Sequence, residues 1–427
     1  MSTDVEALAL RIIELAQAGR FTEIRKLFPQ ALRVMVSAKA LQGAWTAEAG
    51  RRGSLTGIGA AVTDPVRAGV TIVRVPLRYE RSNATLVVSV TRAGQVAGLQ
   101  LAPESASAPV SPWEPPDYAA PERLQEEEVV LGDGSLAVPG TLTLPRSPGP
   151  HPAVLLLAGS GPLDRDSSVG RNKPFKDLAW GLASLGVAVV RFDKVTFAHG
   201  EALQKLAAFT VQDEYMIDAH SAVSLLANRT EVDARRIFVL GHSLGGTVAP
   251  RVAAADPRVA GLIIAAGGAE PLHRAILRQL RYLASLDPAT QAAAEEGLAR
   301  AARQVDLVEQ ADLSPDTPAA SLPLGVPASY WLDLRAYDPV AAAAALERPI
   351  LILQGGRDYQ VTIKDDLERW RAGLAGRPNV VIRVYEADNH MFLTGSGSPT
   401  PTEYEPAQHV DPMVVTTVAE FVSGRGQ

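Results

Sequence analysis

Short, almost wholly apolar runs recur through the C-terminal two-thirds of the chain. They are HPAVLLLAGSGP, GVAVVRFDKV, RIFVLGHSLGG, VAGLIIAAGG, RPILILQGGRD and NVVIRVYEADNH. Because their hydrophobicity is continuous rather than alternating, we expect strands that are buried on both faces of a parallel sheet. The segments between them, such as KPFKDLAWGLASLG, have helical periodicity, and EEEVVLGDGSLAVPGTLTLPR in front of them predicts a hairpin. The pattern predicts an α/β fold, a mostly parallel sheet with helices on both faces.

One interval between these runs is far longer than a crossover connection needs. It extends over residues 271–346 and is rich in alanine, leucine and arginine at helical spacing. A long insertion with its own helices is typical of a cap over an active site. We therefore expect a helical cap here, inside a catalytic domain of residues 123–427.

The first hundred residues have a different pattern. Apolar residues at helical spacing followed by a glycine predict a first helix, on Val5, Leu8, Ile12, Leu15 and Gly19. A short second helix is expected around residues 24–28, and alternating residues predict strands at 73–79, TLVVSVT and VAGLQL. Residues 1–102 are thus expected to form a small α+β domain, which resembles the cone-shaped domains related to nuclear transport factor 2. No catalytic constellation is found in it.

A proline-rich connector separates the two regions. Six prolines lie between Pro103 and Pro121 among small and polar residues. Such composition favours an extended, semi-rigid linker, which we place at residues 103–122.

Composition excludes several classes of function. The net charge of −6 provides no basic surface for nucleic acid, and the absence of cysteine excludes disulfides, zinc–thiolate sites and cysteine nucleophiles. The first residues lack the basic start and apolar stretch of a signal peptide, although a chain trimmed of its export signal would look the same. No apolar run is long enough to span a bilayer. We expect a cytoplasmic protein with no cofactor, no metal and no membrane partner.

The run RIFVLGHSLGG contains the most informative motif, Gly241-His242-Ser243-Leu244-Gly245. A serine between glycines at a sharp strand-to-helix turn is typical of a nucleophile elbow, which exposes the serine hydroxyl above the sheet. Ser243 is therefore the candidate nucleophile. The backbone N–H of Leu244, at the helix start, is a candidate oxyanion donor.

A serine nucleophile needs an acid and a histidine, and in this architecture they follow it in that order at later strand ends. Asp358 follows the apolar strand of RPILILQGGRD, and His390 follows the next one. Because strand ends on one edge of a parallel sheet face a common crevice, these residues are expected to converge with Ser243.

Other histidines and acids compete for these roles. His409 also lies after Asp358, but it heads the presumed last helix and is expected near the surface. His242 is adjacent to the serine and is expected to point away from it. Asp388 precedes His390 by two residues, whereas Asp358 has the better strand-end position.

Three further acids have simpler interpretations. Asp365 and Asp366 are interpreted as structural residues. Asp193 lies at a strand end but precedes the serine, so we expect a structural ion pair with Lys194 or Arg191.

The loop after the first central strand, AGSGPLDRD, is expected to supply the second oxyanion donor. The N–H of Ser160 is the preferred candidate and that of Gly161 the alternative, since glycines let this backbone approach a carbonyl oxygen. A nucleotide-phosphate loop is not favoured, because neither G-x-G-x-x-G nor a Walker lysine pattern is completed.

These motifs carry a family resemblance. GHSLGG, GSGPLDRD, RFDK, SYWLDLRAYDP, GGRDYQV and ADNHMF resemble the α/β-hydrolase superfamily over roughly residues 124–422, and more closely bacterial carboxylesterases with an extra N-terminal domain. The resemblance implies Ser243 as nucleophile, Asp358 as acid, His390 as base, and the Leu244 and Ser160 amides as oxyanion donors. Ala158 departs from it, since many relatives have a histidine before the loop glycine.

The expected reaction is hydrolysis of short- to medium-chain carboxylic esters through an acyl-serine. An acyl-CoA thioesterase, a serine peptidase and a cofactor-free perhydrolase would use the same three residues. The alternative outside the enzymes is a binding protein that keeps the hydrolase fold but has no catalytic activity. The expected partners are a small-molecule ester and a second copy of the chain.

Overall fold

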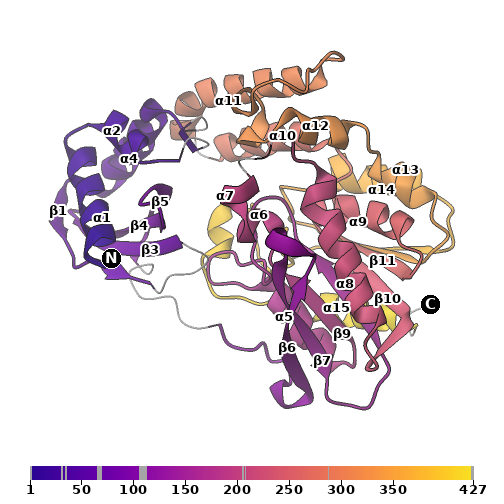
Figure 1. The fold of residues 1–427 in the computed structure, drawn as a ribbon. Coiled ribbons are helices and arrows are strands. Elements are labelled where there is room, and N and C mark those ends of the chain that lie inside the picture. Colours follow the sequence, from indigo (N-terminus) through magenta and orange to yellow (C-terminus); the bar gives the residue numbers. More distant parts are fainter. Residues whose placement is uncertain are drawn as a thin grey trace. The chain divides into compact units, whose positions relative to one another are not determined.

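The computed structural model describes residues 2–29, 32–33, 36–64, 70–104, 113–203, 206, 208–286 and 288–424. The chain forms two compact units. One comprises Met1–Pro112 with Leu280–Ala328, and the other comprises Trp113–Gln279 with Ser329–Gln427. Figure 1 shows the antiparallel sheet of the first unit in indigo to purple, and labels β6, β7, β9, β10 and β11 of the large sheet of the second unit, which run from purple to magenta.

The second unit is built on an eight-stranded sheet in the order β13-β12-β11-β10-β8-β9-β7-β6. Strands β8 to β13 pair in parallel, while β6 and β7 form the predicted antiparallel hairpin, which joins the sheet at β9. The strands are β6 (Leu124–Leu131), β7 (Val138–Pro145), β8 (His151–Leu157), β9 (Ala188–Phe192), β10 (Val232–His242), β11 (Val259–Ala265), β12 (Ile350–Gly355) and β13 (Val380–Tyr385). The predicted α/β-hydrolase fold with a mostly parallel sheet is confirmed.

Helices cover both faces of this sheet. On one face α5 and α15 pack over alternate residues of the central strands, such as Leu240, Ala265 and Leu353, while α8 and α9 contact β10. Since successive strand residues point to opposite faces, both sides of the apolar runs are buried. The helices are α5 (Pro174–Ser184), α6 (Val195–Ala198), α7 (Gly200–Leu203), the π-helical turn η4 (Gln212–Met216), α8 (Ile217–Ala227), α9 (Leu244–Ala255), α13 (Pro339–Ala344), α14 (Glu368–Gly373) and α15 (Pro412–Val422).

The first unit combines helices with a five-stranded antiparallel sheet. The strand order is β1-β3-β4-β5, and β2 pairs with β3. The helix α1 buries Ile12 and Ile13 against β3 and β4, and it ends before Gly19, whose φ is 71°. The elements are α1 (Ser2–Gln17), α2 (Phe21–Lys26), α4 (Ala38–Arg52), β1 (Leu55–Ile58), β2 (Val62–Thr63), β3 (Val70–Tyr79), β4 (Ala84–Thr91), β5 (Val96–Pro103) and α11 (Pro288–Glu309). The α+β composition agrees with the sequence, and the resemblance to nuclear transport factor 2 stays a prediction.

The compact units divide the predicted cap. Residues 271–346 were expected within the catalytic domain, but Leu280–Ala328 belongs to the unit of the N-terminal sheet, where α11 packs on α4. The helix α10 (Leu272–Ser285) begins in one unit and ends in the other, as does α12 (Ala328–Arg335). Helical periodicity shows that a face is apolar but not which element covers it.

The end of the predicted linker is part of the second unit. Trp113 donates from Nε1 to the buried carboxylate of Asp177 at 2.8 Å, and its ring lies edge-on to Trp180 with centroids 5.0 Å apart. Residues 105–112 lie outside the described ranges.

No helix in the described ranges is long and apolar enough to cross a membrane. The cytoplasmic location stays a prediction.

Candidate active site

Ser243 lies at a sharp bend between β10 and α9. Its φ of 55° and ψ of −122° are unusual for a residue with a side chain. A Cβ on Gly241 would lie 2.1 Å from the carbonyl oxygen of Gly245, and one on Gly245 would lie 2.3 Å from that of Leu157. Only glycine at both positions allows the strand and the helix to meet at this bend. The Ser243 N–H donates to Ala265 O at 3.0 Å, which fixes the bend to the neighbouring strand.

Asp358 and His390 are brought together from loops after β12 and β13. His390 Nδ1 donates to Asp358 Oδ2 at 2.7 Å, and both side chains are buried. The other oxygen, Oδ1, accepts from the N–H groups of Gln360 and Val361 at 2.8 and 2.9 Å. A carboxylate held in this way fixes the neutral imidazole tautomer with its proton on Nδ1, so that Nε2 is able to accept a proton.

The two loops are also linked through their backbones. Arg357 N–H donates to Asp388 O at 2.9 Å, and Gly356 N–H donates to Tyr385 O at 2.8 Å. Within the histidine loop, Asn389 Oδ1 accepts from the N–H groups of two following residues, Met391 and Leu393. The acid and the histidine therefore belong to one rigid structure.

A second buried carboxylate holds the acid loop from the other side. Asp366 accepts from the N–H groups of Ala269, Glu270 and Thr362 at 2.9–3.0 Å. Arg278, in the middle of α10, contacts Asp366 and the carbonyl oxygens of the two residues that follow Asp358, Tyr359 and Gln360. Asp366 is thus structural, and it connects the beginning of the predicted cap to the acid loop.

The Ser243 hydroxyl accepts and donates no hydrogen bond within the described part of the chain. It is partly exposed, between the buried His242 and Leu244. Catalytic hydrogen bonds are often long in unliganded enzymes and tighten when substrate binds. The arrangement thus leaves the hydroxyl accessible to a substrate.

The predicted oxyanion loop lies directly against the nucleophile. A Cβ on Gly159 would lie 3.1 Å from the Cβ of Ser243. The N–H of Ser160, which is exposed, has no acceptor among the described residues, and Leu244 is the first residue of α9, so its N–H has no intrahelical acceptor. Two unpaired amides therefore flank the serine.

The competing residues have other partners. Asp388 accepts from the Thr394 hydroxyl at 3.0 Å, and burial raises its pKa to about 6. His409 contacts Asp177 at 3.1 Å and is partly exposed. Neither of them contacts the other predicted site residues.

Asp193 forms a structural ion pair as expected, but the expected partner, Lys194 or Arg191, is wrong. Its carboxylate binds the backbone N–H and the guanidinium of Arg165 at 2.8 and 3.1 Å. Arg191 pairs instead with Glu126 and Asp166. The reason is that the loop after β8 folds back over the end of β9, and this approach is not visible in the local sequence.

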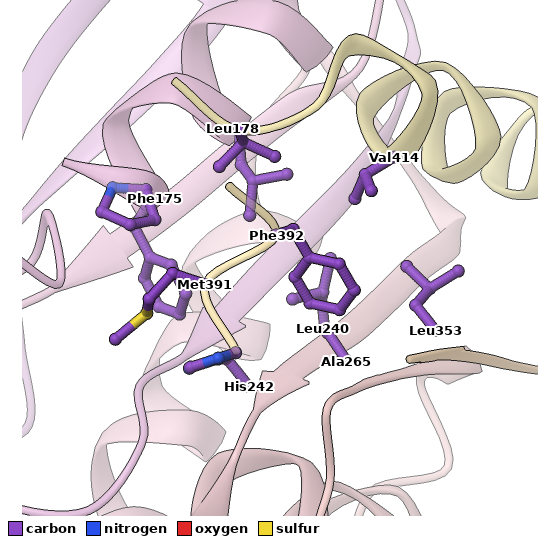
Figure 2. A pocket seen from close by; sticks show the side chains of 11 residues that line it. Phe175, Leu178, Leu240, His242, Ala265, Leu353, Met391, Phe392 and Val414 are labelled. Carbon is purple, nitrogen blue, oxygen red and sulfur yellow. The ribbon is translucent and has the colours of Figure 1, made fainter. Parts of the chain in front are cut away.

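His242 has a role that the sequence did not reveal. Its Nε2–H donates to His390 O at 2.8 Å, and the two rings are 4.6 Å apart between centroids. Figure 2 shows the His242 ring at the edge of an apolar pocket with Phe175, Met391 and Phe392. The loss of hydration on burial, with a smaller effect of His390, lowers the pKa of His242 to about 3. His242 therefore stays neutral and supports the His390 loop.

We predict that His242 makes the fold sensitive to acid. Its pKa is about 3 in the folded chain and 6.5 without these surroundings, so between these values the unfolded chain binds one more proton. The contribution of neutral His242 to stability is complete above pH 6.5 and falls as the pH decreases toward 3, by up to about 1.4 kcal/mol per pH unit. In the His242→Gln variant, the free energy of unfolding should decrease less steeply with falling pH than in the wild-type chain. Urea unfolding of both chains at a series of pH values measures this. An unchanged pH slope would contradict the burial argument.

Comparisons with known proteins show the family of the chain. The family described as "Serine aminopeptidase, S33" matches residues 172–396. The chain is 38% identical over 359 residues to Esterase EstD of Thermotoga maritima, which covers 84% of this chain and 81% of EstD. It is 30% identical over 138 residues to 2,6-dihydropseudooxynicotine hydrolase of Paenarthrobacter nicotinovorans, with 32% and 34% covered. Among solved structures it is similar to Est1E from Butyrivibrio proteoclasticus, at 16% identity and a TM-score of 0.45, over 70% of this chain and 98% of that one.

The matched range contains the elbow, the acid loop and the histidine loop, while the alignment with EstD extends over most of both chains. The chain belongs to the α/β-hydrolase superfamily, in the serine hydrolase family described as "Serine aminopeptidase, S33", and is a relative of EstD.

Proposed function

We propose that the chain is a serine carboxylesterase that hydrolyses short- to medium-chain esters through an acyl-serine. The observation that carries this proposal is the buried 2.7 Å pair of His390 and Asp358 beside an elbow that exposes Ser243. The 38% identity to a protein named as an esterase supports the ester as substrate class.

In the proposed mechanism His390 Nε2 takes the proton of the Ser243 hydroxyl as Oγ attacks the ester carbonyl carbon. His390 then gives this proton to the leaving alkoxide, and the acyl-serine remains. Water then attacks the acyl carbon while His390 takes a proton from the water. The bond between the acyl carbon and Ser243 Oγ breaks, His390 returns the proton to Oγ, and the carboxylic acid leaves. Asp358 holds Nδ1–H and stabilises the imidazolium that forms in both steps.

The negative charge of each tetrahedral intermediate is proposed to lie between the Ser160 and Leu244 amides. Preorganised donors of this kind are worth about 2.7–4 kcal/mol each in barrier height. Because neither N–H group has an acceptor among the described residues, no bond between them has to be broken before they bind the oxyanion.

We predict that Ser243→Ala abolishes the hydrolysis of p-nitrophenyl acetate and the labelling by a fluorophosphonate probe. Loss of the nucleophile in a serine hydrolase reduces kcat by roughly 10⁶-fold, so the variant should fall to background. The exposed Ser285 provides a matched control, since Ser285→Ala should keep both properties. A folded wild-type chain without labelling would instead support the non-catalytic binding protein.

The same three residues would also serve an amide or a thioester, and the family description names an aminopeptidase. We predict that kcat/KM on p-nitrophenyl butyrate exceeds that on an aminoacyl p-nitroanilide and on a short acyl-CoA by at least tenfold, about 1.4 kcal/mol of barrier. Steady-state rates on the three substrates at equal enzyme concentration test this. A kcat/KM on the anilide above that on the ester would favour a peptidase. A kcat/KM on the acyl-CoA above that on the ester would favour a thioesterase.

We further propose that the region assigned from sequence to residues 1–102 mediates self-association, because no proposed site residue lies in it. The intact chain should then show a mass above 45.2 kDa in light scattering at micromolar concentration. The measurement uses the intact chain rather than a deletion of residues 1–102. Because α11 packs on α4, that deletion would expose the covered face of α11. A monomer mass over a range of concentrations would contradict self-association.

A further inference from the structure

The oxyanion loop is supported by a buried lysine from the next strand. Lys194, two residues after β9, donates from Nζ to the carbonyl oxygen of Gly159 at 2.6 Å. The same ammonium contacts the Tyr215 hydroxyl at 2.9 Å and Glu214 Oε1 at 2.8 Å. These three acceptors use all three N–H donors of the ammonium.

Two tyrosines complete this cluster. The Tyr215 hydroxyl lies 3.0 Å from Ala158 O and 2.9 Å from Gly159 O, and the Tyr330 hydroxyl donates to Glu214 Oε2. Burial raises the pKa of Tyr215 well above its usual value, so its hydroxyl remains a donor. The cluster therefore contacts both carbonyls of the loop: Lys194 and Tyr215 bind that of Gly159, and Tyr215 binds that of Ala158.

The burial of this ion pair is difficult to explain by stability alone. Lys194 and Glu214 are only 2% and 5% exposed. Desolvation of two charges offsets most of their attraction, and apolar replacements of buried ion pairs are often as stable. Glu214 and Tyr215 also belong to the π-helical turn η4, a type of turn found frequently at functional sites.

The geometry of the peptide connects the cluster to the reaction. The bond between Gly159 and Ser160 is trans, so the Gly159 carbonyl and the Ser160 N–H point in opposite directions. Because the carbonyl is bound to Lys194, the N–H is directed away from it and is left unpaired. A charged donor on the carbonyl oxygen also polarises the amide, which strengthens its N–H as a donor.

We propose that Lys194, held by Glu214 and Tyr215, is a positioning residue for the oxyanion hole: it orients and polarises the Gly159–Ser160 peptide. This inference rests on the proposed esterase function. Lys194 touches neither substrate nor the reacting atoms, and it acts through the Ser160 N–H.

The test combines a charge-removing variant with a ligand that mimics the tetrahedral intermediate. Lys194→Met together with Glu214→Gln removes the charge without leaving an unpaired buried carboxylate. We expect kcat on p-nitrophenyl butyrate to fall at least tenfold, toward the 10²- to 10³-fold loss of a whole oxyanion donor, with KM within about twofold. The affinity for a trifluoromethyl ketone, which forms a hemiketal on Ser243, should fall by the same factor.

Arg348→Met is the matched control. Arg348 also donates to backbone carbonyls, those of Ala253 and Asp256 around the far end of α9, so its loss should leave kcat and ketone affinity unchanged. If the Lys194 double variant does not fold, the Tyr215→Phe variant tests the proposal instead. It removes a single hydroxyl that holds Lys194 and the loop carbonyls, and kcat and ketone affinity are measured as before. An unchanged kcat and ketone affinity in the folded variant would overturn the proposal. A wild-type chain without esterase activity would instead overturn the proposed function.

Discussion

The close backbone contact at the elbow is the constraint on which the rest of the site depends. The glycines at 241 and 245 allow α9 to start directly against β8 and β10, where any side chain would meet a carbonyl oxygen. Ser243 accepts a positive φ as a result. Such strain persists only where the surroundings hold it, and here a sheet buried on both faces does so.

The sheet order converts this local bend into a catalytic arrangement. On one side of β10 lie β11, then β12, then β13, all parallel to it. The loops that follow β12 and β13 therefore reach the same end of the sheet as the elbow. The loops are then fixed to each other by backbone hydrogen bonds, and the carboxylate of Asp358 is satisfied by two amides and one imidazole. Burial strengthens this pair, since both carboxylate oxygens and His390 Nδ1 have partners.

Polar residues that contact the two loops of the site hold these loops in position. His242 supports the His390 loop from one side, and Asp366 with Arg278 holds the acid loop from another. These contacts use long-range partners, and most of them are buried. They fix the positions of the two loops relative to the sheet.

The sequence by itself determined the strands of the catalytic unit, its fold class and the order of the candidate nucleophile, acid and histidine. Apolar continuity, glycine spacing and strand-end position are local signals, and they are sufficient for these predictions. Only the tertiary structure decided that Asp193 pairs with Arg165, that His242 donates to His390, and that Lys194 lies under the oxyanion loop. It also assigned the middle of the predicted cap to the unit of the N-terminal sheet. The physical reason is that the partner of a polar group or an apolar helix face depends on which distant elements the fold brings beside it.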